Sequence, residues 1–252
     1  MARAAVLGRL TWQVATVESA RTETATARTL VLAVPGWPGH LAGQHVDVRL
    51  TAADGYSTQR SYSIANAPEP DRVELTVQRV AGGEVSPYLV ELAEPGDRME
   101  VRGPVGGYFT WSPDAPDPVL LVAGGSGIVP LMAMIRTRAA IGSRAPFRLV
   151  YSSRGPDDVV YQAELDRLAI GGSGVDCTYV YTRSTPPGWP RAPGRLSGAE
   201  LADAGWPAER RPQVFVCGPT GFVEAVANHL VDQGHLGHRV KTERFGPTGG
   251  GA

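Results

Sequence analysis

A glycine turn near the middle of the chain is the stretch best suited to hold an anion. The apolar run that begins at Val119 ends in Gly124-Gly125-Ser126-Gly127, and Pro130 then opens a segment with helical apolar spacing. A strand that passes through such a turn into a helix points backbone N–H groups and a positive helix end at an anion, typically a phosphate. The glycines do not follow the usual dinucleotide fingerprint. A plain tight connection between strand and helix therefore explains this stretch equally well.

A second candidate is the string Arg60-Ser61-Tyr62-Ser63. Strand alternation places Arg60 and Tyr62 on one face and the two serines on the other. A guanidinium beside an aromatic ring suits a ligand that has both a phosphate and a flat aromatic part. Taken alone, the string fits an ordinary barrel strand with a solvated arginine and a half-buried tyrosine better.

A third candidate is Gly82-Gly83-Glu84-Val85-Ser86, a glycine turn that leads into the helical-looking stretch Ser86–Glu91. Backbone N–H groups of this turn, together with the Ser86 hydroxyl, can hold a second anion. A turn followed by a helix N-cap is the alternative interpretation.

Arginines gather where strands of the second half are expected to end. Ser153-Arg154 ends one predicted strand, Thr182-Arg183 follows the next, and Arg195 lies further along. In dinucleotide-binding sheets an acidic residue here holds the ribose 2′-hydroxyl of NAD, whereas arginine accommodates the 2′-phosphate of NADP. These arginines therefore predict a 2′-phosphate site. The alternative is that they are surface residues in a chain whose only lysine is Lys241.

The string Cys217-Gly218-Pro219 closes another predicted strand. Its cysteine is a nucleophile, a contact at a hydride-transfer site, or a small buried residue. The five histidines form no recognisable triad with it, and a metal pair at His235 and His238 is disfavoured, so no metal site is expected.

Short, alternating, β-branched segments separated by turn residues dominate the first half. Many short strands with little helix predict a closed or nearly closed antiparallel barrel. The predicted strands are Gln13–Glu18, Thr29–Val34, His45–Leu50, Ser61–Ile64, Arg72–Val80, Met99–Val101 and Tyr108–Thr110.

Strands and helices alternate in the second half, which predicts a parallel sheet covered on both faces. The predicted strands are Val119–Ala123, Phe147–Tyr151, Cys177–Tyr181, Gln213–Cys217 and Arg239–Glu243. The predicted helices are Val129–Ala139, Tyr161–Ala169, Ser197–Asp203 and Phe222–Asp232. Proline and aspartate mark residues 113–118 as a linker, so we expect a barrel domain over 1–112 and an α/β domain over 119–252.

Composition excludes several other classes. The 252 residues carry a net charge of −1, which argues against a nucleic-acid binder dominated by phosphate contacts. Two cysteines are too few for a four-cysteine iron–sulfur or zinc site in this chain. No apolar run approaches the roughly 20 residues of a membrane span, so no membrane insertion is expected. Gly8 and Arg9 interrupt the N-terminal apolar stretch, which favours a cytoplasmic protein over a secreted one.

Taken together, these strings resemble the ferredoxin–NADP reductase family of flavoproteins. The motifs that carry the resemblance occur in the family's order: RSYS at Arg60–Ser63, GGEVS at Gly82–Ser86, GGSGIVP at Gly124–Pro130, CGP at Cys217–Pro219 and ERFG at Glu243–Gly246. The resemblance covers nearly the whole chain and implies a flavin-binding barrel followed by a nicotinamide-binding α/β domain.

The resemblance also assigns roles to residues. It implies that Arg60 holds the FAD phosphate, that Tyr62 stacks on the flavin ring, and that Ser63 lies near flavin N5 with Cys217 and Glu243. These three, Ser63, Cys217 and Glu243, are the expected catalytic residues. The expected cofactor-binding residues are Arg60, Ser61, Tyr62, Ser63, Gly82, Gly83, Val85, Ser86, Gly125, Ser126, Gly127, Ser153, Arg154, Thr182, Arg183, Arg195, Gly218, Pro219 and Phe245.

The implied activity is hydride transfer from NADPH, with NADH also possible, to FAD. Single electrons then pass to a separate acceptor protein such as a ferredoxin, an oxygenase or another metalloprotein. An NADH-preferring flavin or oxygenase reductase is one alternative, and an interaction module that has lost the flavin is another. Phe245 stands near the position where relatives cover the flavin with Tyr or Trp, so the covering arrangement stays open.

Overall fold

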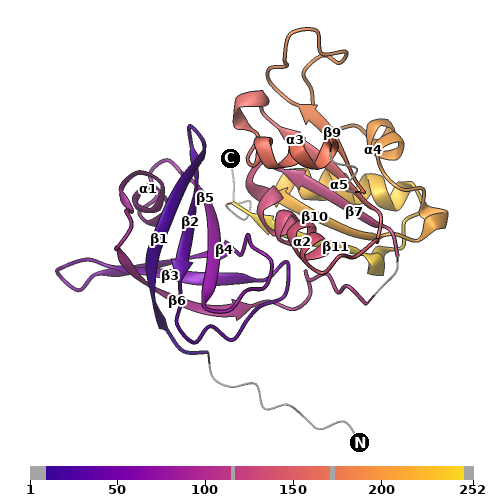
Figure 1. The fold of residues 1–252 in the computed structure, drawn as a ribbon. Coiled ribbons are helices and arrows are strands. Elements are labelled where there is room, and N and C mark those ends of the chain that lie inside the picture. Colours follow the sequence, from indigo (N-terminus) through magenta and orange to yellow (C-terminus); the bar gives the residue numbers. More distant parts are fainter. Residues whose placement is uncertain (1–9, 115–116, 171–173, 247–252) are drawn as a thin grey trace, which may run out of the picture.

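The computed structural model describes residues 10–114, 117–170 and 174–246, which form two sheets that lie side by side (Figure 1). Residues 115–116 of the predicted linker and residues 247–252 of the predicted α/β domain lie outside the described residues, as do residues 1–9. The division of the chain at residues 113–118 stays a prediction.

The first half forms the expected antiparallel barrel. Its strands run in the spatial order β4-β3-β6-β1-β2-β5, and an isolated bridge between Ile64 and Leu75 connects the two edges. The strands are β1 (Gln13–Thr24), β2 (Ala27–Ala33), β3 (His45–Thr51), β4 (Ser57–Ser63), β5 (Arg72–Gln78) and β6 (Arg98–Val105).

Strand β5 illustrates the alternation that builds the barrel. Val73, Leu75 and Val77 are fully buried in the barrel core, whereas Glu74 and Thr76 lie on the opposite face. The predicted helical stretch after β5 is confirmed, as the short α-helix α1 (Val85–Pro87) continues into a π-helical turn over Tyr88–Leu92.

The predicted strand Tyr108–Thr110 is wrong, because this segment is irregular. Phe109 within this segment and Trp111 directly after it face the second sheet. Phe109 packs edge-on against Phe215 at 5.5 Å between ring centroids, and Trp111 packs against Phe147 at 5.2 Å. The aromatic side chains do alternate, but they pack into the core of the second sheet and do not belong to a barrel strand.

The second half forms the expected parallel sheet, in the order β11-β10-β7-β8-β9. Its strands are β7 (Val119–Gly124), β8 (Phe147–Ser153), β9 (Val175–Tyr181), β10 (Gln213–Pro219) and β11 (Val240–Phe245). Its helices are α2 (Ile128–Ala140), α3 (Gln162–Ile170), α4 (Gly198–Ala204) and α5 (Thr220–Asp232).

Apolar side chains cover both faces of this sheet. Leu121 of β7 belongs to a core shared with α2 and α3, whereas its neighbours Leu120 and Val122 belong to a core shared with α4 and α5. Burial of both faces explains why the strands are continuous apolar runs in the sequence.

Polar contacts also join the barrel side to the parallel sheet. Lys241 of β11 donates through Nζ to the Thr110 carbonyl at 2.9 Å, and the Tyr108 hydroxyl donates to the Val240 carbonyl at 3.4 Å. Burial lowers the pKa of Lys241. These bonds tie the segment that follows the barrel to the edge strand of the second sheet.

Candidate functional site

A cavity of about 530 Å³ lies between the barrel and the parallel sheet. Strands β4 and β5 and the Gly82 turn form its barrel wall, while Ser126, in the turn before α2, and Val129, in the first turn of α2, line it from the other side. The sequence-predicted residues that line it are Arg60, Ser61, Tyr62, Ser63, Gly82, Gly83, Val85, Ser86, Ser126 and Phe245. Residues of four motifs that are far apart in sequence therefore line one cavity.

Strand β4 presents a positive charge and a ring to this cavity. Arg60 is exposed, its Nη1 donates to the Gln59 carbonyl at 2.6 Å, and among the described residues no carboxylate lies within ion-pair range of it. Burial raises the pKa of Tyr62 to about 12, so its phenol stays neutral. The Ser61 hydroxyl is already engaged, since it donates to Asp47 Oδ1 at 2.7 Å.

The turn at Gly82 is closed by its own residues. Gly82 has φ of +72°, which suits glycine, and the Val80 N–H donates to Ser86 Oγ at 3.0 Å. The Gly83 N–H donates to the Val80 carbonyl at 3.1 Å. Ser86 therefore stabilises the turn, although it does not cap α1, whose N-cap is Glu84.

The two expected catalytic residues of the parallel sheet lie together. Cys217 of β10 and Glu243 of β11 are register partners, and Sγ lies 3.9 Å from Oε2. Burial raises the pKa of Glu243 to about 7. Burial also raises the pKa of Cys217 well above its usual range, with the Glu243 charge adding to the effect. The thiol is therefore protonated at neutral pH, while the carboxyl is poised to gain or lose a proton.

His45 connects this pair to the barrel, and sequence reasoning missed it. His45 and Ser63 are directly opposite each other in β3 and β4, and His45 Nδ1 lies 3.9 Å from Glu243 Oε1. Burial lowers the pKa of His45. The strand register, which the sequence does not specify, places this histidine opposite Ser63, and the packing of the two sheets brings it close to Glu243.

The central glycine turn is crowded. A Cβ on Gly127 would lie 2.1 Å from the Cys217 carbonyl oxygen, and a Cβ on Gly124 would lie 2.7 Å from the Phe222 ring. Gly218, at the end of β10, is limited in the same way by Phe222 at 2.8 Å. Close packing therefore requires these glycines. Gly125 has φ of +55°, which a glycine adopts at little cost.

The ends of β8 and β9 lie next to each other, as the arginine prediction requires. The Thr182 N–H donates to the Ser153 carbonyl at 2.9 Å, and the Arg183 N–H donates to the Arg154 carbonyl at 2.8 Å. The Arg154 side chain is 45% exposed and forms an ion pair with Asp158 at 3.0 Å.

The loop that carries Arg195 is organised by Arg191, which sequence reasoning did not single out. Arg191 forms an ion pair with Glu200 and donates to the Arg195 carbonyl at 2.8 Å. Arg191 lowers the pKa of Glu200 to about 2. Arg195 itself is exposed. Neither Arg195 nor the residues at the ends of β8 and β9 line the 530 Å³ cavity.

Two further features of the described ranges bear on function. No helix in them is long and apolar enough to cross a membrane. In the same ranges, no three His, Cys, Asp or Glu side chains gather as a metal site would require.

Two family models match the chain. The oxidoreductase FAD-binding domain matches residues 15–110, and the oxidoreductase NAD-binding domain matches residues 121–228. The first covers the barrel and its cavity wall, and the second covers the parallel sheet and the central glycine turn.

Curated relatives agree with these models. The chain is 36% identical over 215 residues to ferredoxin–NADP reductase B of Sorangium cellulosum, which covers 81% of this chain and 84% of that protein. It is 32% identical over 208 residues to the glycine betaine monooxygenase reductase subunit of Pseudomonas aeruginosa, which covers 82% of this chain and 56% of that protein. The chain thus spans only about half of several of the relatives that it matches.

Solved structures show the same two-part fold. An Amycolatopsis cytochrome P450 reductase has a TM-score of 0.81 and 28% identity, covering 94% of this chain and 71% of that chain. The FAD/NAD-binding domain of a Vibrio cholerae nitric oxide dioxygenase has a TM-score of 0.82 and 24% identity, covering 93% of this chain and 99% of that one. With an FAD-binding barrel and a pyridine-nucleotide-binding α/β sheet, the chain belongs to the ferredoxin–NADP reductase family of NAD(P)H-dependent flavoprotein oxidoreductases.

Proposed function

We propose that this protein is an FAD-dependent reductase that oxidises NADPH and passes electrons singly to a separate acceptor protein, such as a ferredoxin or an oxygenase component. One observation carries the proposal. A single cavity joins the Arg60 strand and the Gly82 turn of the barrel to Ser126, at the turn expected to hold the nucleotide. A ligand in the barrel therefore lies against the nucleotide-binding part of the chain.

The residues of the cavity fit FAD. Arg60 offers a guanidinium with no carboxylate partner among the described residues, which suits a phosphate. Tyr62 offers a partly buried neutral ring, which suits stacking on a flat heterocycle. The Gly82 turn, with Gly83, Val85 and Ser86, lies beside them and suits the pyrophosphate. Phe245, which is 37% exposed, lines the mouth of the same cavity and suits a cover for the ring.

FAD held by Arg60, Tyr62 and the Gly82 turn would supply a hydride acceptor that can pass electrons on one at a time. The chain's own residues supply position and proton handling. Glu243, with a pKa of about 7, holds or releases a proton at its carboxyl oxygens near neutral pH. Cys217 stays a neutral thiol next to Glu243, and His45 lies opposite Ser63 and 3.9 Å from Glu243 Oε1. None of these groups acts as a nucleophile in this scheme.

For the nucleotide we propose NADPH, held by the 2′-phosphate through Arg154, Arg183 and Arg195. The adjacent ends of β8 and β9 support this choice, together with the 36% identity to a ferredoxin–NADP reductase. Gly125, Gly127, Ser153, Thr182, Gly218 and Pro219 would form the rest of the nucleotide surface along the carboxyl ends of the strands.

The test is Arg154→Ala. Losing one charged hydrogen bond costs about 1.5–3 kcal/mol, so the kcat/KM for NADPH should fall roughly 10- to 150-fold while that for NADH stays nearly unchanged. Steady-state reduction of ferricyanide with each nucleotide measures this. The matched control is Arg144→Ala, an exposed arginine just before β8 begins, at the opposite end of that strand from Arg154. Equal losses with both nucleotides would overturn the 2′-phosphate assignment.

A second candidate, an NADH-preferring reductase component of an oxygenase, has one observation in its favour. Asp158 already neutralises the Arg154 side chain. A wild-type preference for NADH in the same assay would select this candidate. Purified protein that is colourless and does not bind added FAD would exclude both.

A further inference from the structure

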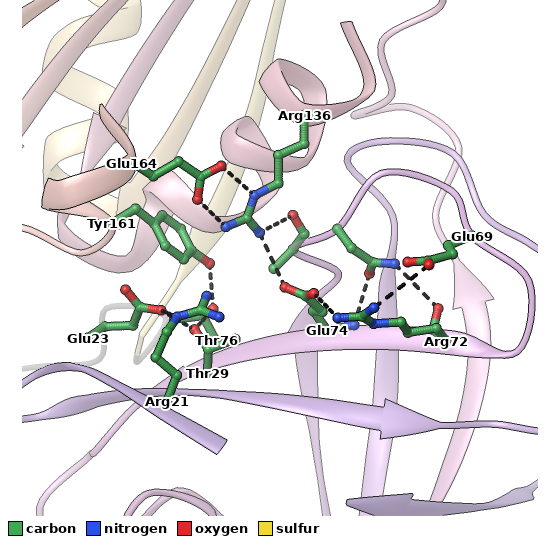
Figure 2. Close-up of polar contacts among 12 residues, drawn as sticks. Arg21, Glu23, Thr29, Glu69, Arg72, Glu74, Thr76, Arg136, Tyr161 and Glu164 are labelled. Atoms are coloured by element: carbon green, nitrogen blue, oxygen red, sulfur yellow. Dashed lines mark hydrogen bonds and ion pairs between the residues drawn. The ribbon is translucent and has the colours of Figure 1, made fainter. Parts of the chain in front are cut away.

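A row of buried hydroxyl groups runs across the interface between the barrel and the α/β part. Tyr161, which precedes α3, donates its hydroxyl proton to Thr76 Oγ1 of β5. Thr76 Oγ1 lies 2.7 Å from Thr29 Oγ1 on β2, and Thr29 Oγ1 donates to Glu23 Oε1 of β1 at 2.6 Å. Figure 2 shows the Tyr161 ring pointing down onto these threonines. We call Tyr161, Thr76, Thr29 and Glu23 the hydroxyl row.

The hydroxyl row has one direction. Each hydroxyl carries a single proton, and that of Thr29 goes to the Glu23 carboxylate. Thr76 must therefore donate to Thr29, which leaves the Thr76 oxygen to accept from Tyr161. Burial raises the pKa of Tyr161, so its hydroxyl stays a donor. A chain of donors that ends on a carboxylate is mutually polarised, so its bonds strengthen one another.

Tyr161 is held in an unfavourable backbone conformation. Its φ is +64°, which is rare for a bulky residue and persists only where the surroundings fix it. The predicted helix Tyr161–Ala169 starts at Gln162 for this reason. Tyr161 is 3% exposed, and the Arg136 guanidinium lies 4.7 Å from its ring centroid.

Arg136 of α2 adds a second connection at the same place. Its Nε and Nη2 donate to the two carboxylate oxygens of Glu164 at 3.0 and 2.6 Å, and its Nη1 donates to the Ala65 carbonyl at 2.8 Å. The same nitrogen lies 3.6 Å from Glu74 Oε2. Glu74 and Thr76 occupy one face of β5 two residues apart, so this strand receives both connections (Figure 2).

Two neighbouring members of the hydroxyl row, Thr76 and Tyr161, belong to the flavin wall and to the nucleotide loop, respectively. Thr76 also lines the 530 Å³ cavity, so its position is part of the flavin wall. Tyr161 ends the loop that starts at Arg154, and the Val160 N–H fixes this loop by donating to the Tyr151 hydroxyl at 3.1 Å. A shift of Tyr161 therefore moves the nucleotide loop relative to the flavin wall.

Building on the proposed function, we propose that Tyr161 and Thr76 are positioning residues, which keep the nucleotide and the flavin in register by bonding the loop over residues 154–161 to β5. The barrel should hold FAD without this bond, and the rim should still bind the adenosine end of NADPH. Loss of the bond should instead disturb the position of the nicotinamide relative to the flavin. A displacement of about 1 Å there can lower the rate of hydride transfer roughly 100-fold.

The experiment compares Tyr161→Phe, Thr76→Val and the double variant with wild type by stopped-flow reduction of the bound FAD. With saturating NADPH, the bound FAD of both single variants should be reduced roughly 10- to 100-fold more slowly than in wild type. The NADPH concentration that gives half of the maximal reduction rate should change less than about threefold. The double variant should be no slower than Thr76→Val, because the hydrogen bond between positions 161 and 76 is absent from both. Thr76→Ser, which keeps the hydroxyl, should restore the rate. The matched control is Tyr88→Phe, which removes a hydroxyl bonded to Asp97 within the barrel.

Two further measurements separate positioning from loss of structure. Oxidation of photoreduced enzyme by ferricyanide does not require the nucleotide, so its rate should be unchanged in Tyr161→Phe and in Tyr88→Phe. Hydrogen exchange of residues 154–165 and of β5 should be faster in Tyr161→Phe than in Tyr88→Phe, with and without FAD. Unchanged reduction rates and exchange in both Tyr161→Phe and Thr76→Val would overturn the proposal, as would an equal slowing in Tyr88→Phe. If neither NADPH nor NADH reduces the wild-type protein, the proposed function is overturned instead. Hydrogen exchange of the flavin-free protein would still decide the role of the hydroxyl row.

Discussion

The two glycine turns of this molecule look alike in sequence and differ in structure. At Gly82-Gly83 the turn borders the cavity, and among the described atoms a Cβ on Gly82 would meet none within 4 Å. In the turn at Gly124–Gly127, a Cβ on Gly124 would collide with the Phe222 ring, and a Cβ on Gly127 would collide with the Cys217 carbonyl. The first turn has space beside it, whereas the second is packed against its own sheet.

The difference shows that a glycine pattern alone does not state why glycine is needed. In the first turn the requirement is a positive φ, and a ligand can approach. In the second, β7 and β10 must come close before the chain can enter α2, and only Ser126 reaches the cavity. Substitutions at the two turns should therefore fail in different ways.

The largest effect is expected for Gly127→Ala. The added methyl would lie 2.1 Å from a backbone carbonyl that cannot rotate away, so the free energy of unfolding should fall by about 3 kcal/mol or more. Urea unfolding followed by circular dichroism measures this. The control is Gly125→Ala, where φ of +55° should cost only about 1–2 kcal/mol. An unchanged midpoint for Gly127→Ala would refute the crowding argument.

The next effect concerns Glu243, which is half-buried next to Cys217, the residue whose carbonyl Gly127 approaches. Its pKa is raised to about 7 from 4.5. Below pH 4.5 the carboxyl is protonated in both folded and unfolded chains and contributes nothing. As the pH rises to 7, only the unfolded chain ionises, so stability falls and stays lower above pH 7.

Glu243→Gln removes this penalty. The variant should exceed wild type in unfolding free energy by up to roughly 3 kcal/mol at pH 8 and match it at pH 4. Urea titrations at the two pH values measure the difference. Glu224→Gln, at an exposed position on α5, is the control. A gain of the same size at both pH values would contradict the assigned pKa.

Arg60→Ala tests whether the cavity beside the Gly82 turn binds FAD, because Arg60 lines the same cavity. Loss of a charge-assisted bond should weaken FAD binding by about 1.5–3 kcal/mol, roughly 10- to 150-fold in Kd, and leave the melting temperature of flavin-free protein unchanged. Fluorescence titration of flavin-free protein measures the Kd. Arg98→Ala, another exposed barrel arginine, is the control. Retention of wild-type affinity would remove Arg60 from the site.

The smallest effect is expected for Gly83→Ala. The new methyl would lie 3.2 Å from the Val80 carbonyl and 3.3 Å from Ser86 Oγ, so the turn must yield by only a few tenths of an ångström. FAD binding should weaken by about 1 kcal/mol, roughly fivefold. The same titration measures it. A larger loss than that of Arg60→Ala would show that the first turn is as crowded as the second.

Much of the fold could be predicted from the sequence, because its signals are local. Alternation predicted the barrel strands, and apolar runs between helices predicted the parallel sheet. Alternation failed at Tyr108–Thr110, since Phe109 and Trp111 alternate to meet the other sheet rather than a neighbouring strand. Period alone does not distinguish these two outcomes.

The candidate site could be predicted only where residues form compact strings. The Arg60 and Gly82 strings share a cavity, and Cys217 and Glu243 are neighbours, although the roles of these residues stay predictions. His45 and Thr76 are isolated residues in ordinary strands. Their importance comes from strand register and from the way two sheets meet, which no local pattern records.

The single lysine gives this protein an unusual chemical property. Lys241 bonds the Thr110 carbonyl and lies 5.2 Å from the Phe215 ring centroid, at the junction of the two sheets. An amine-directed reagent would therefore meet one ε-amino group in the whole chain, and that group is half shielded. The rate of acylation at Lys241, measured by mass spectrometry, would therefore report how often the contact between the two sheets opens, without any engineered label.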